Sequence, residues 1–355
     1  EGQEVVEGAH DLEGRVAHHD ANDLVVGLAL VDHGHDADDA GRAKVQKRTG
    51  AKRAYADYRE MIERERPDLV AIGPRWSDQH HAMASAALKA GAHVYSEKPF
   101  TQTLAEADSL ISLAAQKGRK IAVAHPTRIA PSTLHMKRRL EDGLIGDLVG
   151  IRLHGKQDKR AGGEDLVVLG DHQMDLVRFF AGEPEWCSAR VLHKGRDITL
   201  ADARHPATDK IGLVAGDEIE AMFALPRGVN AHYTSRTKYA RVAGPFGMVF
   251  IGSKGEARLV NGYYPPLFHR TDGPWRPLEN DPTASAPPSE RDQTAGNRRV
   301  VDDWLAAIAE NREPVCSGHE AMKTLEMIHA IFAAGISRTR VALPLKNRQH
   351  PLRKA

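Results

Sequence analysis

Short apolar runs alternate with segments of helical spacing over the first 125 residues. The runs do not alternate with polar positions, so each predicts a strand buried on both faces, as in a parallel sheet covered by helices. Between two of them, Thr103 and Glu106 have capping-box spacing, and apolar residues follow at helical intervals as far as Gly118. This alternation predicts a doubly wound α/β domain. The expected strands cover residues 24–32, 68–73, 93–96 and 121–125.

A different pattern begins at about residue 147. Short strand-like segments follow one another without helices between most of them, which is typical of an antiparallel sheet with one half-exposed face. Residues 273–293 are rich in Pro, Ser and Asp and predict a long loop. Helical spacing returns at residues 297–313 and 320–337.

Composition and charge narrow the class of protein. At 355 residues the chain is long for one core, so two domains are expected. The net charge of +1 and the lack of any apolar run near the roughly 18 residues of a membrane span argue against nucleic-acid and membrane partners. The start of the chain has no signal-peptide pattern, and Cys187 and Cys316 suit a reduced, cytoplasmic protein better than a disulfide framework. The 19 histidines form neither an HxxxH pattern nor a Cys/His cluster, so no metal site is expected.

Candidate cofactor-binding residues follow the predicted strands, because ligands of doubly wound folds bind at the carboxyl ends of the strands. Asp32 ends the strand of residues 24–31, where a carboxylate accepts hydrogen bonds from a ribose 2′-hydroxyl and repels a 2′-phosphate. This favours NAD over NADP; the alternative is an Asp that caps the next helix. Gly73, Pro74 and Arg75 follow the next strand and precede a helix, although Arg75 is equally compatible with a solvated surface charge.

The phosphate-binding loop is the weak point of this interpretation. No G-x-G-x-x-G precedes Leu24, and the only possible earlier strand is the short Val5–Val6. We expect the first strand and its glycine turn to lie just upstream of Gly8, which would then lead into the first helix. A protein that truly lacked this turn would bind a dinucleotide poorly.

The segment SEKPF, residues 96–100, ends the third predicted strand with Glu97, Lys98 and Pro99. A strand that ends in Glu-Lys-Pro after a doubly wound domain resembles the Gfo/Idh/MocA oxidoreductase family, named for glucose–fructose oxidoreductase, inositol dehydrogenase and a rhizopine-catabolism protein. The resemblance covers nearly the whole chain. Its other parts are residues 90–118, the entry into a second domain at residues 140–153, and the last helices and strand at residues 300–345.

This resemblance implies an NAD-binding Rossmann-type domain over residues 1–127, its first strand and glycine loop missing or degenerate. It implies a second α/β domain over residues 128–355, with a large, mostly antiparallel open sheet that forms a homodimer or homotetramer. Sugars and cyclitols are the implied substrates. In the family the Lys of Glu-Lys-Pro reaches both the nicotinamide ribose and the substrate hydroxyl, so Lys98 is the central catalytic candidate; a surface lysine is the alternative. His80 and Glu97 complete the expected cofactor-binding residues.

The segment of residues 160–182 supplies further candidates. The family usually has an Asp four residues before a His and another Asp three residues after it. His172 and Asp175 match, whereas the first position is Val168, which cannot transfer a proton. In a regular α-helix Asp165, Val168, His172 and Asp175 share one face, so we expect His172 as the general base and Asp165 as a carboxylate that orients the substrate. Asp175 is expected to orient or cap rather than react. A His172 that only fills the core is the alternative.

Other candidate substrate-binding residues lie nearby in the predicted layout. Lys156 and Arg160 line the sugar pocket or belong to an exposed loop. His125 and Arg128 follow the fourth predicted strand, and Asp171 ranks below His172 because it lies about 100° around the helix.

The predicted reaction is hydride transfer between a secondary carbinol carbon and NAD, with His172 accepting the hydroxyl proton and Lys98 stabilising the alkoxide. Two alternatives stay open. One is a redox-neutral, NAD-dependent glycoside hydrolase or lyase of the same family, which would accumulate no NADH. The other is a non-catalytic binding or assembly protein, which would not bind NAD.

Overall fold

The computed structural model describes residues 26–29, 42–43, 46–47, 51–73, 77–206, 210–236 and 246–353. The chain forms two compact units. The first contains Glu1–Pro126 and Gln293–Met322, and the second contains Thr127–Asp292 and Lys323–Ala355.

A parallel sheet forms the centre of the first unit. Its described strands are adjacent in chain order: β1 (Val26–Ala29), β2 (Leu69–Ile72), β3 (His93–Ser96) and β4 (Ile121–Val123). Every residue of β2, β3 and β4 is buried, which explains why these segments are apolar without alternation. The predicted strands and their parallel arrangement are confirmed.

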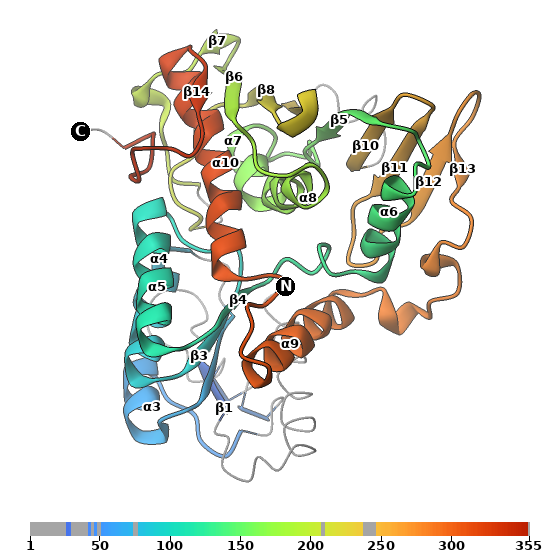
Figure 1. The fold of residues 1–355 in the computed structure, drawn as a ribbon. Helices are drawn as coiled ribbons and strands as arrows, with labels where there is room; N and C mark the ends of the chain where they lie inside the picture. The colour runs from blue at the N-terminus through green and yellow to red at the C-terminus, as the bar shows by residue number, and fades with distance from the viewer. Residues whose placement is uncertain are drawn as a thin grey trace. The chain divides into compact units, whose positions relative to one another are not determined.

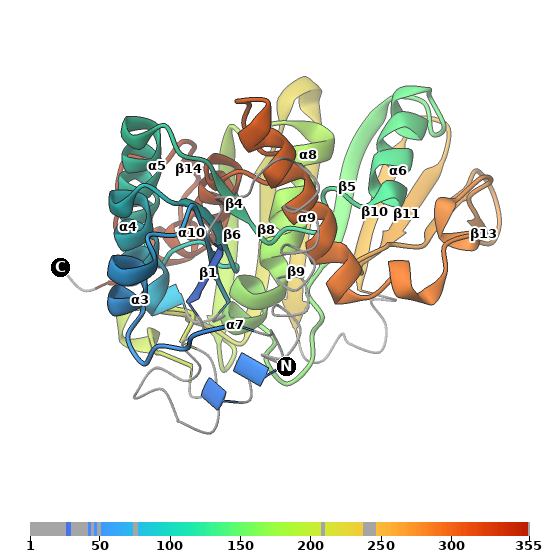
Figure 2. The same ribbon diagram turned by 90° about the horizontal axis from the view of Figure 1, so that it is seen from below.

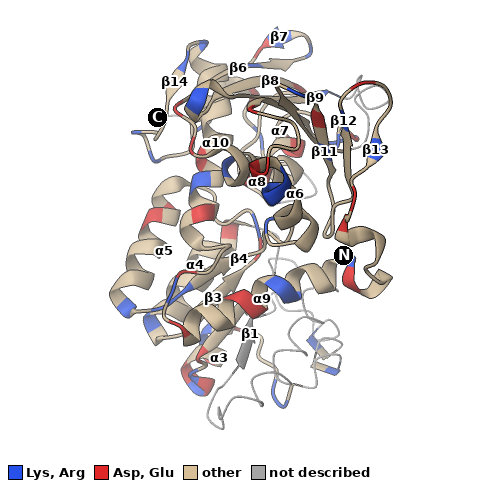
Figure 3. Cartoon of the chain, turned by 45° about the vertical axis from the view of Figure 1, so that its right-hand side comes forward, with Lys and Arg blue, Asp and Glu red and all other residues tan. Residues whose placement is uncertain are grey.

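Helices cover both faces of this sheet (Figure 1). Helices α3 (Tyr58–Glu65), α4 (Ser77–Ala90) and α5 (Leu104–Lys117) lie on one side, and α9 (Gln293–Ala309) lies on the other, as Figure 2 also shows. The predicted capping box of Thr103 and Glu106 begins α5. Both α4 and α5 have an acidic residue in the first turn and a lysine in the last turn, which suits the helix dipole (Figure 3).

The assignment of α9 differs from the prediction, which placed residues 293–322 in the second domain. Trp304 of α9 is buried, its ring centroid lies 6.2 Å from that of Tyr95 in β3, and its Nε1 donates to the carbonyl of Lys120 at 3.5 Å. Farther along, Ser317 forms an antiparallel bridge with Ala122 of β4. The chain therefore returns to the first unit, because the exposed face of its sheet requires a covering helix.

A ten-stranded sheet dominates the described part of the second unit. Its order is β13-β12-β11-β10-β5-β9-β8-β6-β14, with β7 paired to β6. The pairing is antiparallel except between β5 and β9, which are parallel. Residues of β8 and β9 alternate between buried and partly exposed, as expected for a sheet with one open face. The strands are β5 (Leu148–His154), β6 (Trp186–His193), β7 (Arg196–Asp197), β8 (Glu218–Ala224), β9 (Asn230–Arg236), β10 (Gly247–Gly252), β11 (Glu256–Val260), β12 (Leu267–Arg270), β13 (Arg276–Pro277) and β14 (Val341–Ala342).

Helices pack against the inner face of this sheet. Met136 of α6 (Pro131–Glu141), Leu176 of α8 (Asp171–Ala181) and Ile328 of α10 (Gly318–Ser337) join one core with the buried strand residues. A short α7 (Gly163–Asp165) and a π-helical turn (Leu166–Gly170) lead into α8. Short 3₁₀ turns occupy Leu200–Asp202, Pro226–Gly228, Pro282–Ala284 and Pro288–Glu290. The last two, together with β13, lie in the predicted long loop of residues 273–293. No helix among the described residues is long and apolar enough to span a membrane.

Candidate active site

The Glu-Lys-Pro segment lies at the carboxyl edge of the parallel sheet in the first unit. Backbone N–H of Glu97 donates to the carbonyl of Ile72 at 2.9 Å, which continues the pairing with β2 beyond the end of β3. The buried carboxylate of Glu97 accepts the backbone N–H of Lys98 at 3.1 Å. Lys98 itself is partly exposed, and the peptide bond that joins it to Pro99 is cis. The fold thus fixes the backbone here and leaves the lysine side chain at the surface of the unit.

His80 lies beside the segment that follows Lys98. Its side chain is fully buried, and Nδ1 lies 2.8 Å from the carbonyl oxygen of Pro99 and 3.2 Å from that of Phe100. These contacts require the proton on Nδ1, so that the ring donates to the backbone. His80 therefore ties α4 to the segment that follows Lys98, and its expected contact with the cofactor stays a prediction. A contact between residues 19 positions apart leaves no signal in the sequence.

His125 follows β4 and is almost completely buried in the first unit. Its backbone N–H donates to the carbonyl of Val123 at 2.7 Å, and its carbonyl accepts the thiol of Cys316 at 3.4 Å. Its expected contact with substrate stays a prediction. The remaining cofactor candidates Gly8, Asp32, Pro74 and Arg75 lie outside the described residues.

The candidate residues of the second unit do not share one regular helix. A π-helical turn over Leu166–Gly170 separates Asp165 from α8, where His172 occupies the first turn. Hydrogen bonds from i to i+5 insert one extra residue, which rotates everything downstream by about 100° relative to an α-helix. The predicted common face of Asp165, Val168, His172 and Asp175 is therefore wrong. Val168 itself is buried and apolar in its surroundings.

Asp165 faces the protein interior rather than solvent. It is fully buried, and its carboxylate accepts the hydroxyl of Ser235 at 2.7 Å and the backbone N–H groups of Gln157 at 3.0 Å and Lys156 at 3.2 Å. Burial raises the pKa of this carboxyl, and the three hydrogen bonds oppose that shift. The chain supplies three hydrogen bonds to this carboxylate, and the substrate-orienting role expected for Asp165 stays a prediction.

His172 differs from its helical neighbours in its exposure. It is partly exposed, whereas Asp171 and the residues from Gln173 to Arg178 are buried. A partly exposed imidazole near the start of a helix is open to a ligand, which a core histidine is not. Its role as general base stays a prediction.

Asp175 and Arg128 form a buried ion pair. Nη1 of Arg128 donates to Oδ1 of Asp175 at 2.7 Å, and the Thr324 hydroxyl lies 3.4 Å from the same oxygen. The guanidinium also lies 5.1 Å from the ring centroid of Phe179. Asp175 therefore holds the segment after β4 against α8, and its expected place among the substrate-binding residues stays a prediction. The expected contact of Arg128 with substrate stays a prediction.

The basic residues upstream of α7 lie in the loop after β5. Arg160 pairs with Asp158 through two of its nitrogens, at 2.9 and 3.2 Å, and the Lys156 ammonium lies 3.8 Å from the same carboxylate. Lys156 is exposed and Arg160 partly exposed. Both are accessible, as a substrate-binding loop requires, while their contact with substrate remains a prediction.

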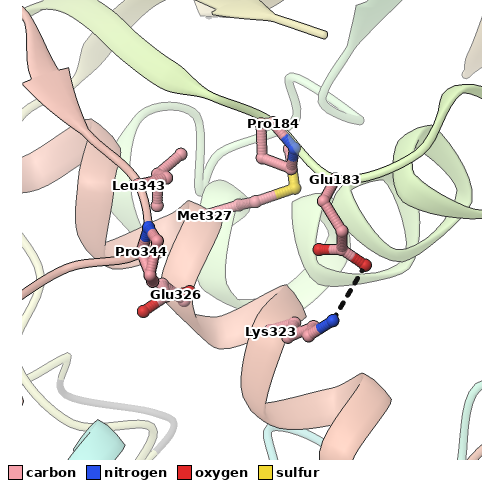
Figure 4. A pocket seen from close by; sticks show the side chains of 7 residues that line it. All are labelled: Glu183, Pro184, Lys323, Glu326, Met327, Leu343 and Pro344. Atoms are coloured by element: carbon pink, nitrogen blue, oxygen red, sulfur yellow. Dashed lines mark ion pairs between the residues drawn. The ribbon is translucent and has the colours of Figure 1, made fainter. Parts of the chain in front are cut away.

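A small pocket of about 180 Å³ lies at the other end of α8 (Figure 4). Glu183 and Lys323, 3.2 Å apart, line its mouth, and Met327 forms part of its apolar wall. Since α8 rises about 1.5 Å per residue, this pocket is roughly 15 Å from the turn that carries His172. It is distinct from the candidate active site. Its full lining is Glu183, Pro184, Lys323, Glu326, Met327, Leu343 and Pro344.

The parallel strands of the first unit end together at its described carboxyl edge, where doubly wound folds bind their ligands. Lys98 follows this edge, is partly exposed and stands on a backbone held by Glu97 and His80. A ribose and a reacting alcohol both offer hydroxyl oxygens to such a cation. This fold is typical of dinucleotide-binding enzymes.

Comparison with known proteins identifies the family. Residues 15–125 match the oxidoreductase-family model with an NAD-binding Rossmann fold, and residues 137–343 match the model of its C-terminal alpha/beta domain. The chain belongs to the Gfo/Idh/MocA oxidoreductase family and has that family's NAD-binding domain. The resemblance first seen at Glu97-Lys98-Pro99 is thus confirmed, as is the expected α/β architecture.

Individual relatives are more distant. D-apiose dehydrogenase of Paraburkholderia graminis is 27% identical over 320 residues, which cover 84% of this chain and 78% of that protein. Levoglucosan dehydrogenase of Pseudarthrobacter phenanthrenivorans is 25% identical over 210 residues, which cover 52% and 53%. Among solved structures, a levoglucosan dehydrogenase in complex with NADH and levoglucosan has a TM-score of 0.71 at 19% identity, over 90% of each chain. An NAD-binding oxidoreductase from Klebsiella pneumoniae has a TM-score of 0.72 at 19% identity, over 96% of each chain. These structures show the shared fold.

Proposed function

We propose that this oxidoreductase oxidises a secondary hydroxyl of a sugar, glycoside or cyclitol. Two of its relatives are named D-apiose dehydrogenase and levoglucosan dehydrogenase. Lys98 of the first unit and His172 of the second, each partly exposed, are the residues proposed to supply the required chemistry. NAD, when bound, supplies the hydride acceptor; NADP is disfavoured by an acid at position 32.

Lys98 is the residue proposed to stabilise the negative charge on the reacting oxygen. Its Nζ donates a hydrogen bond to the substrate oxygen and stabilises the negative charge that develops when the hydroxyl proton leaves. The backbone contacts of Glu97 and His80 fix where the side chain begins. Lys98 is partly exposed, which is compatible with contact with a substrate.

His172 is the proposed general base. A ring nitrogen accepts the proton of the substrate hydroxyl, a role for which a histidine near neutral pH is suited. The buried pair of Arg128 and Asp175 fixes α8, and the basic loop with Lys156 and Arg160 is proposed to contact other hydroxyls. His125 and Asp171 complete the proposed substrate-binding residues.

Two further proposals concern the protein as a whole. The partly exposed face of the large sheet, seen in the alternating exposure of β8 and β9, supports assembly as a homodimer or homotetramer. Cys187 and Cys316 are buried free thiols, which supports a reducing, cytoplasmic location.

The experiment that tests the proposed chemistry follows NADH formation across a panel of sugars, inositols and glycosides. We expect Lys98→Met and His172→Ala each to lower kcat by about 10²- to 10⁴-fold, the range typical of lost acid–base or charge catalysis. The control Lys89→Met removes an exposed lysine at the end of α4 and should behave as the wild type.

Three outcomes would contradict the proposal. Full activity of Lys98→Met or His172→Ala would remove that residue from the chemistry. Glycoside cleavage without NADH would move the protein to the redox-neutral class. A full-length protein that does not bind NAD and converts no member of the panel would favour a non-catalytic role.

A further inference from the structure

The buried carboxylate of Asp165 joins three segments of the second unit. Its oxygens receive the Ser235 hydroxyl at the end of β9 and two backbone N–H groups of the loop after β5. Ser235 in turn accepts the backbone N–H of Gly162, just before α7, at 2.9 Å. Asp165 therefore ties the start of the α7–α8 segment both to β9 and to the loop after β5, and β5 and β9 are neighbouring strands of the sheet.

Close packing surrounds this carboxylate. A Cβ on Gly155 would lie 1.9 Å from Oδ2 of Asp165 and 2.9 Å from the hydroxyl of Tyr233. A Cβ on Gly170, at the end of the π-helical turn, would lie 3.0 Å from the same hydroxyl. Glycine at both positions lets Asp165 and Tyr233 enter the space beside the turn. The site is thus built around the carboxylate.

The π-helical turn begins directly after Asp165. Such turns are rare because an α-helical register has better hydrogen-bond geometry, so something outside the turn must hold it. Before the turn in the chain, Asp165 is anchored to Ser235 and to the loop after β5. After the turn, α8 is fixed by the ion pair of Asp175 with Arg128. A segment fixed at both ends accommodates its extra residue as a π turn.

We infer that Asp165 is a positioning residue: by anchoring the π-helical turn it sets the rotation of α8 and the direction in which His172 points. The expected effect on catalysis rests on the proposed function of His172 as general base, whereas the positioning of His172 does not. Without the anchor the segment relaxes towards an α-helical register, and downstream residues rotate by about 100°. Because the residues on either side of His172 are buried, this rotation takes the imidazole towards the interior.

The experiment compares Asp165→Asn and Ser235→Ala with the full-length wild-type protein. The matched control is Asp197→Asn, the same chemical change in a surface ion pair with Arg190 in the same unit. Diethyl pyrocarbonate modifies accessible neutral imidazoles, and trypsin then releases residues 161–178, a peptide in which His172 is the only histidine. Its mass reports the modification of this one residue.

We expect His172 to be modified about tenfold more slowly in Asp165→Asn and Ser235→Ala, the change that follows when nine-tenths of the molecules adopt the relaxed register. On a substrate that the wild type oxidises, kcat should fall by about tenfold, because one-tenth of the molecules keep the native register, while the KM for NAD is unchanged. A loss of stability alone would lower the unfolding temperature without slowing the modification of His172 or lowering kcat at an unchanged KM for NAD. Asp197→Asn should match the wild type in every measurement.

The two proposals fail in different ways. A folded Asp165→Asn protein whose His172 is modified at the wild-type rate would overturn the positioning role, whatever its activity. If Asp165→Asn does not fold, Ser235→Ala decides by the same criterion. If the wild type oxidises no substrate, the proposed function fails, and slower modification of His172 would still support the positioning role.

Discussion

Exposure separates the polar residues of the candidate active site by role. Lys98 and His172 are partly exposed, while His80, Asp165 and Asp175 are buried and bonded to the chain. A buried charge is tolerated only when its hydrogen bonds are satisfied, so such residues are suited to holding structure. Residues that must meet a substrate need to keep part of their hydrogen-bonding capacity for it.

His350 provides a pH test at the scale of one residue. Burial lowers the pKa of its imidazole to about 4, and its Nδ1 accepts the backbone N–H of Leu352 at 3.2 Å. The folded protein therefore holds the ring neutral, whereas the unfolded chain is protonated below about pH 6.5. The stability that depends on the neutral ring is complete above pH 6.5 and is lost as the pH falls from 6.5 to 4.

We expect His350→Gln to weaken this pH dependence by on the order of 3 kcal/mol over that interval, measured by denaturant unfolding at several pH values. His269→Gln, which changes a partly exposed histidine of β12, is the control. An unchanged pH dependence in His350→Gln would show that the ring is not held neutral in the folded protein.

At the scale of elements, the sequence predicts strands and α-helix ends well and the π-helical turn not at all. Strands β2 to β4 are apolar because both of their faces are buried, and the capping box of α5 is a local contact of residues three apart. The π turn depends on anchors at Asp165 and Asp175, whose partners lie tens of positions away in the chain. A prediction from regular α-helical spacing therefore put Asp165 and His172 on one helix face, which is wrong.

The start of α7 offers a test of close packing between elements. A Cβ on Gly163 would lie 2.3 Å from the carbonyl oxygen of Ala215, a backbone atom that cannot move aside independently. We expect Gly163→Ala to lower the free energy of unfolding by about 1–3 kcal/mol, as overpacking does. At Gly262 a Cβ would meet nothing within 4 Å, so Gly262→Ala should change stability little. Equal stabilities of the two variants would contradict the close approach.

At the scale of the whole molecule, the two units are not continuous in the chain as the sequence suggests, because residues 293–322 belong to the first unit. The helical pattern of residues 297–313 predicts α9 correctly, but periodicity cannot tell which sheet an apolar helix face will cover. Contacts of Trp304 with Tyr95 and with the carbonyl of Lys120 place it in the first unit. The family and its two-domain architecture were nevertheless predictable, because the Glu-Lys-Pro segment and the later matches at residues 140–153 and 300–345 are each continuous in sequence.

The central claim is that this NAD-binding protein performs a net oxidation of a sugar or cyclitol. The most direct test measures the stoichiometry of NADH formed to substrate consumed by the full-length protein. We predict a one-to-one ratio, with both changes lost in Lys98→Met. Substrate consumption with no accumulated NADH would contradict the account and indicate a redox-neutral reaction.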